Sequence, residues 1–167
     1  MKQKLTFLLT AVLLLTGMTL QAQSRAEASI DFSQQGYENA QDFDGVVIDI
    51  DDNVSVVFNK GTGNNGPKYY NTGTAIRAYG GNNFVISSTS TITGITLTFG
   101  SGEGSNELTT DVGSFSSPSW TGSSTEVTFT VGGTSGHRRI KEIAVTYTAG
   151  GGQQETVATP TFSPAGG

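Results

Sequence analysis

The chain has 167 residues with a formal net charge of −5, no cysteine and only one histidine. This acidic balance argues against a nucleic-acid partner, because phosphate binding needs a basic face, and the lack of cysteine excludes a thiol nucleophile. Glycine, at 23 residues, exceeds its usual share, and the charged fraction of 14% falls below it, which favours strands and tight turns over helices.

Residues 1–22 have the pattern of a secretory signal peptide. Lys2 and Lys4 form a basic start, the run from residue 5 to residue 20 is mostly apolar, and Ala22 offers a small residue at the cut site. We expect a signal-peptide helix that is cleaved after Ala22. The alternative is an uncleaved anchor, for which the run is short, since a span takes ~20 residues. The mature chain is expected to be secreted, periplasmic or at the cell surface, without membrane insertion.

Short apolar runs that alternate with polar residues predict strands along residues 23–148. The expected strands are 30–32, 46–50, 54–58, 75–79, 84–87, 92–99, 107–112, 127–131 and 140–147. Residues 34–45, 60–74, 100–106 and 113–125 are expected to be loops. About nine short strands without a helix-period segment predict an all-β fold, an antiparallel β-sandwich of the jelly-roll type.

Two irregularities interrupt the alternation. Ile92 is out of phase with the strand that follows it, and Ile140 is out of phase with Ile143. We therefore expect β-bulges near residues 93–94 and 141–142.

Residues 120–147 are the stretch around which the domain is organised. Two alternating runs flank a loop that is rich in glycine, and this loop is expected to present His137, Arg138 and Arg139 at a surface.

Two stretches resemble known families. The segments PKYYNTGTAIRAYGGN, WTGSSTEVTFTV and GTSGHRRIKEIAVTY resemble a β-sandwich module of multidomain secreted bacterial proteins. The resemblance covers roughly residues 28–148 and implies a sandwich fold and an accessory role, with no settled activity. The segment VATPTFSPAGG is similar to the opening of the chitobiase/β-hexosaminidase C-terminal domain, a small immunoglobulin-like module.

Only the first strand of that second module is present. Residues 149–167 are therefore expected to be a linker rich in Gly and Gln, followed by the incomplete start of the module. This resemblance implies that the chain is a truncated product or part of a longer multidomain protein.

Few residues offer catalytic chemistry. Residues 61–66 match the dinucleotide pattern G-x-G-x-x-G, but Pro67 follows where that site needs a helix, so a turn-rich loop is the better interpretation. His137, as the only histidine, excludes zinc sites built on several histidines. A Ser-His-Asp hydrolase stays open, although no serine lies in G-x-S-x-G.

Two binding sites are candidates. The carboxylates of Asp44, Asp49, Asp51 and Asp52 could hold a structural calcium ion, and the alternative is a charged hairpin turn. No other cofactor is expected. The side chains with which a polysaccharide or other glycan could be bound are Tyr69, Tyr70, Arg77, Tyr79, Trp120, His137 and Arg138.

Each of these side chains also has a structural interpretation. Sugar rings stack on aromatic faces, yet a lone tryptophan in a sandwich is more often a core residue, and Arg138 could pack its stem over an aromatic ring.

The first hypothesis is therefore a secreted, non-catalytic accessory module that binds carbohydrate or a surface glycan. The second hypothesis is a purely structural or adhesive spacer domain, and a hydrolase that uses His137 is the third.

Overall fold

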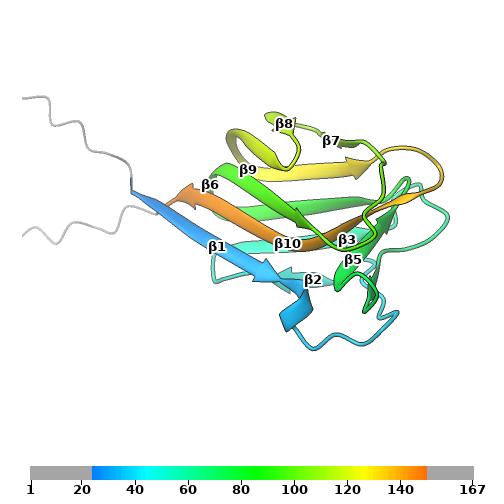
Figure 1. Cartoon of the computed structure of the whole chain (residues 1–167). Coiled ribbons are helices and arrows are strands. Elements are labelled where there is room, and N and C mark those ends of the chain that lie inside the picture. The colour runs from blue at the N-terminus through cyan, green and yellow to red at the C-terminus, as the bar shows by residue number, and fades with distance from the viewer. Residues whose placement is uncertain (1–23, 150–167) are drawn as a thin grey trace, which may run out of the picture.

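The computed structural model describes residues 24–149, which form one curled antiparallel sheet of ten strands without an α-helix (Figure 1). The strands are β1 (Arg25–Asp31), β2 (Val47–Asp49), β3 (Val54–Asn59), β4 (Lys68–Tyr70), β5 (Ala75–Tyr79), β6 (Asn83–Phe99), β7 (Leu108–Thr110), β8 (Ser114–Ser116), β9 (Ser119–Val131) and β10 (His137–Thr148). A 3-10 turn, η1 (Phe32–Gln34), follows β1. The all-β prediction is confirmed.

Three sequence predictions concern other parts of the chain. The signal peptide, the linker and the incomplete C-terminal module lie outside the described residues, apart from residue 149. Over residues 24–149, no helix has the length and apolar character needed to cross a membrane.

The long strands β6 and β9 make the sheet fold over on itself. The first half of β6 pairs with β3 and with the second half of β9, whereas its second half pairs with β10 and with the first half of β9. Strands β2 and β7 extend the first layer, and β8, β1, β5 and β4 extend the second. Because both layers share β6 and β9, the sandwich is one continuous sheet.

Both predicted bulges are confirmed. The register between β6 and β9 shifts between Ile92 and Gly94, and the register between β10 and β6 shifts between Ile140 and Glu142. The irregularity in β6 near Ile92 lies next to the point where this strand passes from one layer to the other, and a bulge lets a strand bend there.

Three predicted boundaries are wrong. The loop expected at residues 60–74 contains β4, and the loop expected at 113–125 contains β8 and the first half of β9. His137, Arg138 and Arg139 belong to strand β10 and not to the glycine-rich loop. These segments pair through their backbones, and none of them has the apolar alternation on which the predictions depended: β4 and the start of β10 consist of basic and aromatic residues, and β8 and the first half of β9 are rich in Ser, Thr and Gly.

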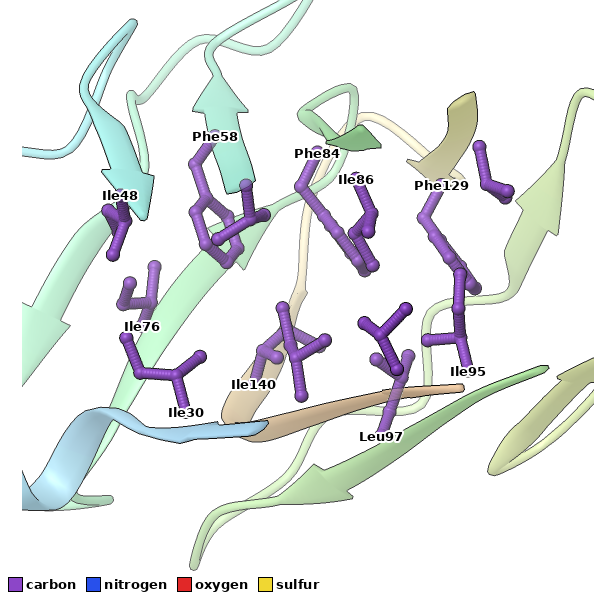
Figure 2. Close-up of a cluster of buried hydrophobic side chains, with 14 of the residues drawn as sticks. Ile30, Ile48, Phe58, Ile76, Phe84, Ile86, Ile95, Leu97, Phe129 and Ile140 are labelled. Atoms are coloured by element: carbon purple, nitrogen blue, oxygen red, sulfur yellow. The ribbon is translucent and has the colours of Figure 1, made fainter. Parts of the chain in front are cut away.

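The core lies between the two layers. In Figure 2, Phe58, Phe84 and Phe129 on one side face Ile140 and Leu97 on the other. All five side chains are at most 2% exposed, and the rings of Phe84 and Phe129 stack with their centroids 4.8 Å apart. Apolar burial of this kind is the main favourable term in folding.

The two ends of the described chain lie side by side. The amide of Ala149 donates to the carbonyl of Ser24 at 2.9 Å, next to the end of the antiparallel pair formed by β1 and β10 (Figure 1). His137, at the start of β10, is roughly 36 Å away along the strand at ~3.3 Å per residue. The loops that follow β3, β5 and β9 therefore lie at the end of the sandwich opposite the termini.

Candidate functional site

Strands β4, β5 and β10 place an aromatic and basic set of side chains on one face of the sheet. Directly opposed residues share a face, and the register opposes Lys68 to Arg77, Arg77 to Arg139, and Tyr79 to His137. Ile76 and Ile140 face the core, so this set lies on the outer face. We call it the basic aromatic face; its members are Lys68, Tyr70, Arg77, Tyr79, His137 and Arg139.

Two tyrosines surround the guanidinium of Arg77. The carbon Cζ of Arg77 lies 4.8 Å from the ring centroid of Tyr70 and 5.8 Å from that of Tyr79. The two tyrosine hydroxyls share a hydrogen bond of 3.1 Å. This bond, together with burial, raises the pKa of Tyr70, so its hydroxyl stays neutral at physiological pH.

Arg139 is the most buried cation of the face, with 8% of its surface exposed. Burial, and then repulsion from the Arg77 charge, lower the pKa of Arg139, but an arginine remains charged at neutral pH. A side chain on Gly73 would collide with the guanidinium, since an added Cβ would lie 2.2 Å from Nη1. The loop at Gly73 thus closes tightly over Arg139.

His137 stands beside this cation. Its Nε2 lies 3.2 Å from the carbonyl oxygen of Gly102 and 3.4 Å from Nε of Arg139. The nitrogen can donate to the carbonyl or accept from the guanidinium, but it cannot do both. Within residues 24–149, no hydrogen bond joins His137 to a serine or a carboxylate, so the geometry there assembles no Ser-His-Asp triad.

Arg138 has structural partners. Its Nε forms an ion pair with Glu103, its Nη1 donates to the carbonyl of Asn106 at 2.8 Å, and its guanidinium lies 4.3 Å from the ring centroid of Phe99. The other oxygen of Glu103 accepts from the backbone amide of Arg139 at 2.5 Å. These contacts fasten the loop at residues 100–106 to β10, and they occupy the side chain that the sequence offered for glycan binding.

Tyr79 lines two hollows. The first, of about 400 Å³, is bounded by β5, the loop after β9 and His137; the second, of about 370 Å³, contains Tyr70 and Lys68 in its wall. Both share Asn64, Asn65 and Tyr79 as lining residues. Asp42, Asp44, Lys60 and Gly66 complete the second hollow. One aromatic residue thus lines two cavities whose other walls contain amides, hydroxyls and charges.

A buried asparagine holds this loop in place. Asn82 is 0% exposed; its Oδ1 accepts from the amide of Tyr79 at 2.7 Å, and its Nδ2 donates to the carbonyls of Lys60 and Asn65 at 2.8 and 2.9 Å. A side chain on Gly63 would displace this amide, because an added Cβ would lie 2.4 Å from Nδ2. Asn82 therefore fixes the wall that both hollows share.

Two glycan candidates from the sequence lie in the core. Tyr69 is 5% exposed and Trp120 is 1% exposed, and the indole Nε1 donates to the carbonyl of Val112 at 2.7 Å. Neither ring can stack on a ligand from solvent, because both pack against the inside of the sandwich. Tyr70, Arg77, Tyr79 and His137 remain, and the structure brings these four together on the basic aromatic face.

The four calcium candidates are not gathered at one point. Asp44 lies beside Phe58 near the end of β3, whereas Asp49, Asp51 and Asp52 lie around the turn between β2 and β3. No group of three or more potential ligands is positioned for a metal ion within the described part of the chain. Asp51 instead caps the turn: its Oδ1 accepts from the amides of Asn53 and Val54 at 2.8 and 2.7 Å.

We expect the charge of Asp51 to stabilise the fold in a pH-dependent way. Burial acts to raise its pKa, but hydrogen bonds from the Tyr147 hydroxyl and two amides outweigh it and lower the pKa. A folded-state pKa below the unfolded one gives stability that is complete above about pH 4 and lost as pH falls through the lowered pKa. Asp51→Asn should therefore lower the melting temperature at pH 7, and the difference from wild type should shrink towards pH 2.5. A gap that is constant over this range would contradict the assignment.

Several residues of the site carry no sequence signal. Lys68, Asn64 and Asn65 lie in a segment predicted to be a loop, Asn82 in a predicted turn, and Arg139 beside the chosen candidates. Arg77 and Tyr79 alternate with Ile76 and Ala78, so their common face could be inferred from β5 alone. The other members meet them only through pairing between distant strands.

The chain matches no family model, no curated protein and no solved structure in the comparisons. The resemblances to the secreted β-sandwich module and to the chitobiase/β-hexosaminidase C-terminal domain therefore stay predictions.

Proposed function

We propose that the chain is a secreted, non-catalytic accessory module that binds carbohydrate or a surface glycan at the basic aromatic face. The observation that carries the proposal is that Tyr79 lines both hollows, with Tyr70 in the wall of the second. Sugar rings have apolar C–H faces that pack on aromatic rings, and their hydroxyls need amide or carboxylate partners. Asn64 and Asn65 line both hollows and offer such partners.

The position of the site agrees with an accessory role. The described chain begins and ends side by side at one end of the sandwich (Figure 1). His137 and Tyr79 of the basic aromatic face are paired at the other end of β10. A module attached through its termini would present this face outwards. Secretion, and attachment to further domains of a longer protein, belong to the same proposal and come from the sequence of residues 1–22 and 149–167.

The absence of catalysis is part of the proposal as well. It is supported by the surroundings of His137, whose Nε2 has a carbonyl and a guanidinium as neighbours within residues 24–149. A general base needs a nucleophile or a substrate proton within hydrogen-bond reach.

Binding of immobilised polysaccharides, followed by titration calorimetry, tests the proposal. Tyr79→Ala should weaken the affinity for any bound glycan about fivefold or more, because truncation of an aromatic contact at a binding site costs ~1 kcal/mol or more. Tyr37→Ala is the matched control: that ring is also half-buried, but it packs on Phe43 and Tyr69. The control should lose stability and keep its affinity.

A spacer domain without a ligand is the second candidate. Burial of Tyr69 and Trp120 favours it, since both rings stabilise the core. It predicts that no glycan is retained and that Tyr79→Ala changes stability alone. That pair of results would overturn the proposed function.

A further inference from the structure

The basic aromatic face contains a row of cations that form no ion pair within the described chain. Lys68, Arg77 and Arg139 lie directly opposite one another across β4, β5 and β10. Like charges in this arrangement destabilise a sheet. The one ion pair found within residues 24–149 joins Arg138 to Glu103, so it includes none of these three side chains.

Burial makes this arrangement more costly. The Nε of Arg77 is buried and has no hydrogen-bond partner among the described residues. Arg139 beside it is 8% exposed. An unpaired buried donor carries a desolvation penalty that folded proteins rarely leave uncompensated. The rings of Tyr70 and Tyr79 offset part of it through cation–π contacts, but they accept no hydrogen bond from Nε.

The local charge is opposite to that of the whole protein. The chain has a formal net charge of −5, yet these three cations gather at one end of an acidic molecule. Such a cluster attracts anionic groups and holds them where the surface is hollowed. The planar guanidinium of an arginine complements the geometry of a carboxylate, and a neighbouring lysine adds further positive charge.

The acidic residues nearby narrow the class of ligand. Asp42 and Asp44 line the second hollow together with Lys68, Tyr70 and Tyr79. These carboxylates would repel a small ion such as phosphate or sulfate, which presents charge on every side, whereas they accept hydrogen bonds from the hydroxyl groups of a ligand that carries its charge at one end. The hollow therefore suits a ligand that has one anionic group and several hydroxyls on a ring with an apolar face.

We infer that the site takes an acidic saccharide, with the carboxylate of a uronic-acid unit against Lys68 and Arg77 and its ring against Tyr70 and Tyr79. This inference rests on the proposed function and specifies its ligand class. Arg139, directly opposite Arg77 on β10, adds positive charge to the row, and Asp42, Asp44, Asn64 and Asn65 line the hollow where the ring hydroxyls would lie.

Titration calorimetry with polygalacturonate and with its methyl-esterified form tests the inference, since the two polymers differ in charge and share a backbone. We expect the charged form to bind at least about tenfold more tightly in low salt, and the preference to shrink as salt screens the carboxylates. Dextran sulfate against dextran separates a carboxylate site from a general site for anions. Binding of the sulfated polymer alone would overturn the inference.

Three variants assign the effect to the row of cations. Arg77→Gln and Lys68→Gln should each reduce the preference for the charged polymer about tenfold, and Arg77→Lys should retain part of it. Arg25→Gln removes an equal charge at the other end of β10 and should change nothing. Melting curves confirm that each variant is folded. If Arg77→Gln is unstable, Lys68→Gln replaces it as the test, because Lys68 is only half-buried in β4.

The outcomes separate the two proposals. Equal binding of the charged and the esterified polymer, unaffected by Arg77→Gln, overturns the inference and leaves the glycan-binding proposal intact. Binding of neither polymer, and of no other glycan in the panel, overturns both.

Discussion

Trp120→Ala is expected to lower the free energy of unfolding by ~3–5 kcal/mol, the cost of removing a large aromatic side chain from a core. The indole is 1% exposed, and its Nε1 donates to the carbonyl of Val112 at 2.7 Å. The substitution leaves both a cavity and an unpaired carbonyl. Urea denaturation of wild type and variant, followed by circular dichroism, measures the loss.

Trp120→Phe is the matched variant for the hydrogen bond. It keeps most of the ring volume and loses the donor, so we expect a smaller cost, about 1–3 kcal/mol. Gly122→Ala crowds the indole, because an added Cβ would lie 2.5 Å from its Cζ2 atom. Both variants should be less stable than wild type.

The same burial predicts the behaviour of Trp120 in solution. Iodide and acrylamide should quench its fluorescence slowly in the folded protein and efficiently after unfolding. In folded Trp120→Phe, glycan affinity should be unchanged, since Trp120 lies outside both hollows. Rapid quenching in the native state, or a glycan affinity that depends on the indole, would contradict the core assignment.

Trp120 illustrates what the sequence could not decide. Ser, Gly and Pro surround it in the chain, which is typical of a loop, and a lone aromatic residue in such a segment can be a contact or a core residue. The backbone of β9 pairs with β6 and β8 on either side of it and turns the ring inwards. That pairing is between distant segments, so no local pattern reports it.

The strands with a clear alternation were predictable because their pattern is local in the sequence. In β3, and in β5 from Ile76 onwards, buried and half-buried residues alternate as the pleat requires. The slips at Ile92 and Ile140 were informative as well, because an extra residue shifts all later side chains to the other face. Ser88 to Thr91 carry no apolar residue, and the two predicted strands around them are one strand, β6.

The candidate site was predictable in its parts and not in its arrangement. Tyr70, Arg77, Tyr79 and His137 were chosen from the sequence as aromatic and basic residues near loops. Their meeting depends on the register that opposes Tyr79 to His137 and Arg77 to Arg139. The register between strands that lie about 60 residues apart in the chain is a property of the whole sheet. The row of cations depends on this register, so the sequence alone could not predict it.

Asn82→Ala is expected to lower both stability and glycan affinity. The buried amide makes three hydrogen bonds to the backbone, to Tyr79, Lys60 and Asn65. At ~1 kcal/mol net for each bond, the loss should be about 3 kcal/mol. Asn82→Asp should be at least as destabilising at neutral pH, because a carboxylate oxygen would then face the two carbonyls that the amide now serves.

The loss of the Asn82 side chain should also weaken glycan binding at the candidate site. Without the Asn82 side chain, the loop that contains Asn64 and Asn65 loses two of the hydrogen bonds that tie it to the turn between β5 and β6, and the wall that both hollows share is held less firmly. We therefore expect weaker glycan binding even under conditions in which the variant is fully folded.

Asn83→Ala is the control for this substitution. Asn83 is half-buried, and its side chain makes one hydrogen bond, with Asn59 at 3.1 Å, so its loss should cost about 1 kcal/mol or less and leave affinity unchanged. Denaturation curves and calorimetry on both variants separate the two effects. Full affinity in folded Asn82→Ala would mean that the 60–66 loop takes no part in binding, and the ligand would then have to be held by the strand residues Tyr70, Arg77 and Tyr79 alone.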